Sequence, residues 1–132
     1  MSKIVLDTNV VIAAFAARGL CESVFELCLE KHDLITSNFL FNELREKLKK
    51  KLKLPESITE EILETYRRSS QEVIPASFEL DLCRDPDDIP VIGTCISGEA
   101  EFLVSGDKDL LVLKSVGSTL ILSPREFYEL QK

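Results

Sequence analysis

Residues 3–15 read KIVLDTNVVIAAF, and an aspartate interrupts their apolar run. Residues 3–6 have the composition of a buried strand, and residues 10–15 that of an apolar helix. The Asp-Thr-Asn sequence between them therefore forms a polar hinge between two core elements. A charge is costly to bury at such a place unless the protein uses it. Asp7 is accordingly the first candidate functional residue.

The rest of the chain alternates between apolar strands and helices. Further strands are predicted at residues 33–37, 72–75, 102–105 and 118–122. Helices are predicted at residues 9–31 with a break near Arg18 and Gly19, from Asn38, from Ser57, around residues 87–91, after residue 107 and from Pro124. Ser57 and Glu60 have the spacing of a capping box, Ser123 is expected to cap the last helix, and residues 76–86 are expected to form a loop.

This alternation predicts one α/β domain spanning residues 1–132, because strands separated by helices pair in parallel. The sheet is expected to be mostly parallel and to carry helices on both faces. No apolar run is long enough for a transmembrane helix, and residues 1–20 lack the pattern of a signal peptide. We therefore expect a cytoplasmic protein without a membrane partner.

Charge and cysteine content exclude several other classes. The net charge of −7 argues against nucleic-acid binding by general electrostatic attraction, so phosphate recognition would need added cations. The four cysteines lack the spacing of a zinc site, and the single His32 has no ligand partner nearby. We interpret Cys21, Cys28, Cys83 and Cys95 as reduced thiols, mostly of the core.

Four carboxylates are expected to meet at one edge of the sheet. Ligands of open parallel sheets bind beyond the carboxyl ends of the strands, where the strand order reverses. Asp7 and Asp107 each follow a strand directly, Glu43 lies early in the helix after the second strand, and Asp88 begins a helix. Each acid also has a structural interpretation when it is taken singly. Asp88 or Asp87 could cap a helix, Glu43 could be a solvated helix residue, and Asp107 could be a turn residue.

Clustered carboxylates without histidine or cysteine favour a hard divalent cation, Mg²⁺ or Mn²⁺. Such a cation binds phosphate oxygens and lowers the pKa of a bound water molecule. It also offsets the repulsion between an acidic protein and a polyanion. The residues therefore point to phosphoryl chemistry.

Four segments together resemble the PIN domain family: LDTN, NFLFNELREKL, CRDPDDIPVIGTCISGEAEFLVSGDKDLL and SPREFYEL. The resemblance covers essentially the whole chain and is strongest to small prokaryotic VapC-like toxin components. It implies a three-layer fold and a metal-dependent endoribonuclease, often dimeric and often inhibited by a small antitoxin. It also implies that Asp7, Glu43, Asp88 and Asp107 are the catalytic, metal-binding acids, and that Thr8, Asn9 and Ser105 support them.

The chain departs from the family at Ile89, where close relatives commonly have asparagine after the third acid. Asp85 and Asp87 crowd Asp88, so the third ligand could be one of these neighbours. Asp109 is a candidate supporting residue or the cap of the short helix that follows. Lys47, Lys50, Lys51 and Lys108 are candidate RNA contacts, although the lysine-rich helix also fits a solvated face.

Two other interpretations stay open. Ile89 and the acidic composition also fit a catalytically weak PIN-like module that binds RNA or a partner protein. An aspartyl phosphotransferase or receiver domain would also place acids at strand ends. A D-x-D phosphotransferase, however, would have an aspartate where this chain has Asn9, and no aspartate follows the third strand, as a receiver requires.

Overall fold

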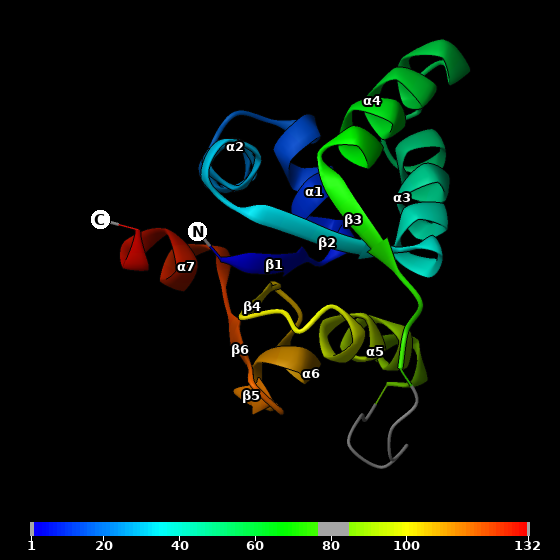
Figure 1. Cartoon of the computed structure of the whole chain (residues 1–132). Helices are drawn as coiled ribbons and strands as arrows, with labels where there is room; N and C mark the ends of the chain where they lie inside the picture. Colours follow the sequence, from blue (N-terminus) through cyan, green and yellow to red (C-terminus); the bar gives the residue numbers. More distant parts are fainter. Residues whose placement is uncertain (1, 77–84, 132) are drawn as a thin grey trace.

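The computed structural model describes residues 2–76 and 85–131. Within these ranges, six strands form one sheet in the order β3-β2-β1-β4-β6-β5, with helices on both of its faces (Figure 1). All neighbouring strands pair in parallel except β5 and β6, which are antiparallel. The predicted α/β class with a mostly parallel, covered sheet is confirmed.

The strands are β1 (Lys3–Leu6), β2 (Asp33–Ser37), β3 (Ser70–Val73), β4 (Phe102–Val104), β5 (Ser115–Val116) and β6 (Thr119–Leu122). The helices are α1 (Thr8–Ala16), α2 (Leu20–Lys31), α3 (Asn38–Lys50), α4 (Glu56–Arg68), the 3₁₀ turn η2 (Pro86–Asp88), α5 (Ile89–Ser97), α6 (Lys108–Leu111) and α7 (Pro124–Leu130). The predicted break near Arg18 and Gly19 separates α1 from α2.

Strand β1 is buried on both faces, which explains why its sequence is continuously apolar. Ile4 and Leu6 pack into one core cluster with residues of α1, α2, α3, α4 and α7. Val5 points to the opposite face, where it packs with residues of α5 and α6. The period of two along the strand therefore divides the core into two layers.

The strand order reverses between β1 and β4, which lie side by side at the centre of the sheet. From β1 the chain builds outward to β2 and β3 on one side, and β4 leads to β6 and β5 on the other. The Asp7 amide extends the β1–β4 pairing by donating to the Val104 carbonyl oxygen at 2.9 Å. Both strands thus deliver the residues that follow them to the same point.

The predicted third strand at residues 72–75 is misplaced by two residues, because β3 spans Ser70–Val73. Ser70 and Gln71 pair with Leu34 and Ile35 of β2. Pro75 has no amide hydrogen to donate to a ladder, and it follows the strand. The polar character of this edge strand hid its beginning from a search for apolar runs.

The predicted capping box at Ser57 and Glu60 is also wrong. Helix α4 begins at Glu56 and Pro55 holds the cap position, so Ser57 lies inside the first turn. The second predicted cap is confirmed: Ser123 Oγ accepts from the Glu126 amide at 3.1 Å, and Glu126 Oε1 accepts from the Ser123 amide at 2.9 Å. Helix α7 therefore has a complete capping box.

Strand β5 was not predicted from the sequence. It forms a hairpin with β6, in which Val116 pairs with Thr119 across a two-residue turn. Gly117 has a φ of 58° in that turn, a conformation that glycine adopts without the strain of a side chain. Only two residues of β5 take part, which is too short a run for periodicity to reveal.

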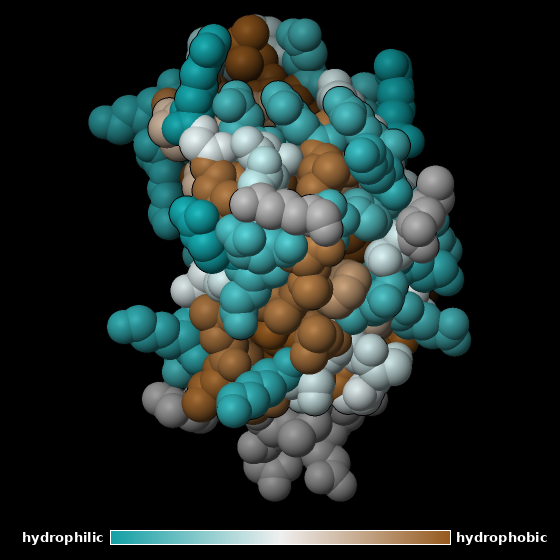
Figure 2. Space-filling view, turned by 90° about the vertical axis from the view of Figure 1, so that its left-hand side faces the viewer, coloured by the Kyte–Doolittle hydropathy of each residue, from teal (hydrophilic) through white to brown (hydrophobic). Residues whose placement is uncertain are grey.

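Apolar side chains also reach the surface. Among the large hydrophobic residues, Phe15, Ile58, Val112, Leu120 and Leu130 are exposed. Figure 2 shows hydrophobic residues gathered in a band on one face, between hydrophilic residues. No helix within the described ranges is long and apolar enough to cross a lipid bilayer.

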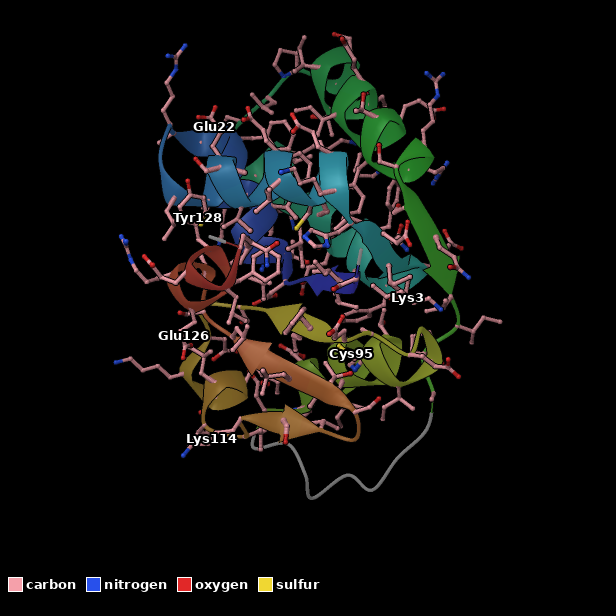
Figure 3. The ribbon with its side chains drawn as sticks, turned by 60° about the vertical axis from the view of Figure 1, so that its left-hand side comes forward. Lys3, Glu22, Cys95, Lys114, Glu126 and Tyr128 are labelled. Atoms are coloured by element: carbon pink, nitrogen blue, oxygen red, sulfur yellow. The ribbon has the colours of Figure 1, made fainter. Side chains whose placement is uncertain are left out.

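The described cysteines are free thiols. Cys28 and Cys95 are buried, and burial raises the pKa of each to about 12. Figure 3 shows Cys95 on α5, and its side chain packs with the core cluster on that face of the sheet. Cys21 is half-buried, whereas Cys83 lies outside the described residues, as does most of the predicted loop. The interpretation of Cys28 and Cys95 as core thiols is confirmed.

Candidate metal centre

A cavity of about 140 Å³, named the acidic cavity below, opens beyond the carboxyl ends of β1 and β4. Its lining combines six carboxyl side chains with one ammonium, one amide and one apolar side chain. The lining residues are Asp7, Asn9, Glu43, Lys47, Asp85, Asp87, Asp88, Val91 and Asp107. The structure therefore brings together all four acids that the sequence analysis selected.

Asp7 lies in the floor of this cavity, with 7% of its surface exposed. Its Oδ2 accepts a 2.7 Å hydrogen bond from Ser105 Oγ, a fully buried hydroxyl that follows β4. Burial raises the pKa of Asp7, the Ser105 bond and the Lys47 charge lower it, and Glu43 and Asp107 raise it again. Asp7 is thus a buried acid held by one strong hydrogen bond.

Asp107 is the N-cap of α6, where its Oδ1 accepts from the Asp109 amide at 2.9 Å. The Asp107 amide in turn donates to Ser105 Oγ at 3.0 Å. Ser105 therefore links the two acids that follow β1 and β4, since its hydroxyl contacts both residues. The alternative in which Asp109 caps this helix is wrong, because that residue lies inside the first turn.

Glu43 enters the cavity from α3 with a lysine one helical turn further along. Lys47 Nζ lies 3.9 Å from Glu43 Oε1 and donates a 2.9 Å hydrogen bond to Asn9 Oδ1. Both side chains of the ion pair are about three-quarters buried, at 25% and 27% exposed. Lys47 thereby joins α3 to the beginning of α1, where Asn9 lies.

Asp88 is buried, with 7% of its surface exposed, at the junction of η2 and α5. It occupies the cap position of α5, but its carboxylate makes no capping hydrogen bond within the described part of the chain. Burial first, and then the charges of Asp107, Asp85, Asp7 and Asp109, raise the pKa of Asp88 to about 7. This acid therefore carries much of the mutual repulsion of the cluster.

The neighbours of Asp88 have different surroundings. Asp85 Oδ1 accepts from the Asp87 amide at 3.0 Å, so its carboxylate caps the 3₁₀ turn. Asp87 is exposed, although it also lines the cavity. Ile89 is half-buried and does not line it. Burial distinguishes Asp88 from both neighbouring aspartates.

Several of the predicted supporting residues lie elsewhere. Thr8 is buried and lines a separate small interior cavity with Thr36 and Tyr66, and its Oγ1 has no hydrogen-bond partner among the described residues. Asp109 is half-buried beside the acidic cavity without lining it. Of the candidate RNA contacts, Lys50, Lys51 and Lys108 are exposed and Lys47 is half-buried.

The donor set fits a divalent cation in chemistry. Six carboxylates and one amide oxygen are hard ligands of the kind that Mg²⁺ and Mn²⁺ prefer. Residues 2–76 and 85–131 contain no group of three acidic, histidine or cysteine side chains already drawn into metal-binding geometry. The carboxylates line the cavity without forming such a group in this structure.

The sequence analysis missed a buried hydrogen-bond link between the helices that carry Glu43 and Asp88. The hydroxyls of Thr94 of α5 and Ser37 are hydrogen-bonded to each other at 2.8 Å, and both residues are fully buried. Thr94 Oγ1 also donates to the Pro90 carbonyl oxygen at 2.7 Å. Ser37 is the N-cap of α3 and accepts from the Leu40 amide at 3.4 Å. This contact joins the beginning of α3 to α5.

Comparisons with known proteins agree with this fold. A family model described as PIN domain matches residues 3–109. The solved structures with a similar fold include one described as VapBC2 from Rickettsia felis bound to a DNA fragment from their promoter. That match has a TM-score of 0.64 and 15% sequence identity, and it covers 92% of this chain and 98% of the other. No curated protein matches the chain.

Proposed function

Because this chain belongs to the PIN domain family, we propose that it is a divalent-cation-dependent nuclease that hydrolyses RNA phosphodiester bonds. The observation that carries the proposal is the acidic cavity, where six carboxyl side chains gather at the point of strand reversal. Such a concentration of negative charge is costly unless a cation offsets it. Burial first, and the charges of the neighbouring carboxylates second, raise the pKa of Asp88 to about 7.

We assign the cation ligands to Asp7, Glu43, Asp88 and Asp107. When bound, Mg²⁺ or Mn²⁺ supplies positive charge for phosphate oxygens and acidifies a water molecule. Ser105 orients Asp7 through its 2.7 Å hydrogen bond and is a positioning residue. Asp88 is favoured over Asp85 and Asp87 as the third ligand, because it alone of these three aspartates is buried.

The exposed lysines support RNA as the substrate. Lys50 and Lys51 lie at the end of the helix that carries Glu43, and Lys108 follows Asp107 directly. Two other cations of α3 are engaged within the fold: Arg45 pairs with Glu60 at 3.5 Å and Lys49 with Glu56 at 3.6 Å. A substrate backbone would therefore contact Lys50, Lys51 and Lys108 rather than the whole basic helix.

We further propose a toxin-like role with a small antitoxin as partner. The fold similarity to a chain of a VapBC2 structure supports this assignment. Phe15 of α1 and Ile58 and Ile62 of α4 line an open groove of about 250 Å³, which offers an apolar surface to a partner. A homodimer is the other expected assembly, and light scattering of the purified protein measures it directly.

The test is cleavage of a fluorescent RNA panel with Mn²⁺, Mg²⁺ or EDTA. Asp7→Asn and Asp107→Asn are expected to abolish a cleavage that needs the metal, whereas Asp87→Asn should retain most of it. Metal-dependent cleavage that survives Asp7→Asn would contradict the proposed site. Binding of RNA without cleavage, in a folded protein that binds the metal, would favour the binding module with Ile89 as the first residue to replace.

A further inference from the structure

Lys47 is placed differently from the other lysines of α3. Its ammonium lines the acidic cavity, and among the described residues no other cationic side chain does so. Lys49 instead pairs with Glu56 of α4, and Lys50 is exposed. All of these lysines carry the same charge. Their surroundings differ because they lie on different faces of α3.

The contacts of Lys47 are with two oxygen atoms that are themselves suitable metal ligands. Its Nζ donates to Asn9 Oδ1 at 2.9 Å and lies 3.9 Å from Glu43 Oε1. Its charge also favours the ionised form of Asp7. With 25% of the side chain exposed, this ammonium is less screened by solvent than a surface lysine.

We propose that Lys47 is the built-in counter-ion of the acidic cavity and competes with a divalent cation for the Glu43 and Asn9 oxygens. The inference rests on the proposed metal site and adds a function to it. In the metal-free protein the ammonium offsets part of the repulsion among the six carboxylates. Occupation of the same oxygens by a divalent cation requires the ammonium to leave them, since like charges repel at that distance.

The displaced side chain has a second use. Lys47 extends from α3 on a flexible four-carbon stem, so its ammonium can turn toward the cavity opening without movement of the helix. There it meets the substrate phosphate. Lys47 therefore offsets part of the repulsion among the acids before the metal binds and contacts the nucleic acid afterwards.

The test measures Mn²⁺ binding rather than activity. The wild-type protein, Lys47→Met and Lys47→Gln are stripped with EDTA, dialysed and titrated with Mn²⁺ by isothermal calorimetry at pH 7.5. Removal of the competing ammonium is expected to tighten Mn²⁺ binding by about five- to tenfold in both variants. The metal-free variants are also expected to melt at a lower temperature than wild type, because six carboxylates then lack their cation.

Lys49→Met is the matched control, since it removes the same charge from α3 without touching the cavity. Its Mn²⁺ affinity should stay within about twofold of wild type, because an exposed charge is well screened. Equal or weaker Mn²⁺ binding by the two Lys47 variants would overturn the inference while leaving the metal site intact. Absence of Mn²⁺ binding in every protein would instead overturn the proposed function, and the inference with it.

Discussion

Ser105 Oγ donates a 2.7 Å hydrogen bond to Asp7 Oδ2, although 98 residues separate the two in the chain. The same hydroxyl accepts from the Asp107 amide at 3.0 Å. The bond crosses from the residues after β4 to the residue after β1, at the place where the strand order reverses. One buried hydroxyl thus fixes the positions of two acids of the candidate metal centre relative to each other.

Ser105→Ala should weaken the fold and the site together. It removes the donor to Asp7 and leaves a buried carboxylate without that partner, so the free energy of unfolding should fall by about 1–3 kcal/mol. Urea unfolding at pH 8 measures the change. Ser118→Ala, at an exposed turn position, is the control and should stay within about 0.5 kcal/mol of wild type. An equally small effect at Ser105 would show that the bond contributes nothing to stability.

Asp88 should make the metal-free protein less stable as the pH rises. Its folded pKa of about 7 exceeds 3.8, the pKa of an unperturbed aspartate, so the folded state binds more protons between those values and stability falls across that window. Asp88→Asn removes the ionisation. In EDTA, the melting temperature of the variant minus that of wild type should be near zero at pH 4 and greatest above about pH 7. A difference that stays constant with pH would contradict the raised pKa.

Thr94→Val should loosen the connection between α3 and α5. The variant keeps the branched shape of threonine but removes the hydroxyl that is hydrogen-bonded to Ser37 Oγ at 2.8 Å and to the Pro90 carbonyl oxygen at 2.7 Å. The free energy of unfolding should decrease by about 1–3 kcal/mol, because the site is fully buried. Thr94→Ser, which keeps the hydroxyl, should lose less in the same urea titration. If Thr94→Ser were instead less stable than Thr94→Val, the methyl group rather than the hydroxyl would account for the stabilisation.

Gly93→Ala should destabilise the protein although alanine favours helices. An added Cβ would lie 2.6 Å from the Ala76 carbonyl oxygen and 3.0 Å from Pro75 Cβ, so the backbone after β3 must move. At Gly106 nothing lies within 4 Å, and Gly106→Ala should be neutral or stabilising by up to about 1 kcal/mol. The melting temperatures of the two variants and of the wild-type protein measure these effects. A Gly93→Ala protein as stable as wild type would show that Gly93 and the Ala76 backbone are not packed tightly against each other.

Those parts of the fold that follow from strong local patterns were predictable from the sequence. Val5 and Leu6 belong to a run that can only be a doubly buried strand, and the acids after it follow from the geometry of parallel sheets. Ser70 and Gln71 were missed because an edge strand needs no apolar pattern to pair. Ser57 was misassigned because capping sequences recur inside helices, and only the backbone shows where the helix begins.

Several side-chain contacts within the site could not be predicted from the sequence, because they join residues that lie far apart in the chain. Thr94 lies in an apolar helix and its partner Ser37 is 57 residues away, so no local pattern joins them. Lys47 was a candidate RNA contact, and its ion pair with Glu43 was not predicted, although a spacing of four residues is a signal for such a pair on one helix face. Thr8 was expected beside the acids, but α1 turns its side chain toward an interior cavity.

The central claim is that the acidic cavity binds a divalent cation, and crystals grown with Mn²⁺ test it most directly. An anomalous difference map is expected to contain a peak about 2.0–2.4 Å from carboxylate oxygens of Asp7, Glu43, Asp88 and Asp107. In Asp7→Asn crystals grown under the same conditions that peak should weaken or vanish. A map of the wild-type protein with no peak in this cavity at saturating Mn²⁺, or with peaks only elsewhere on the surface, would contradict the account.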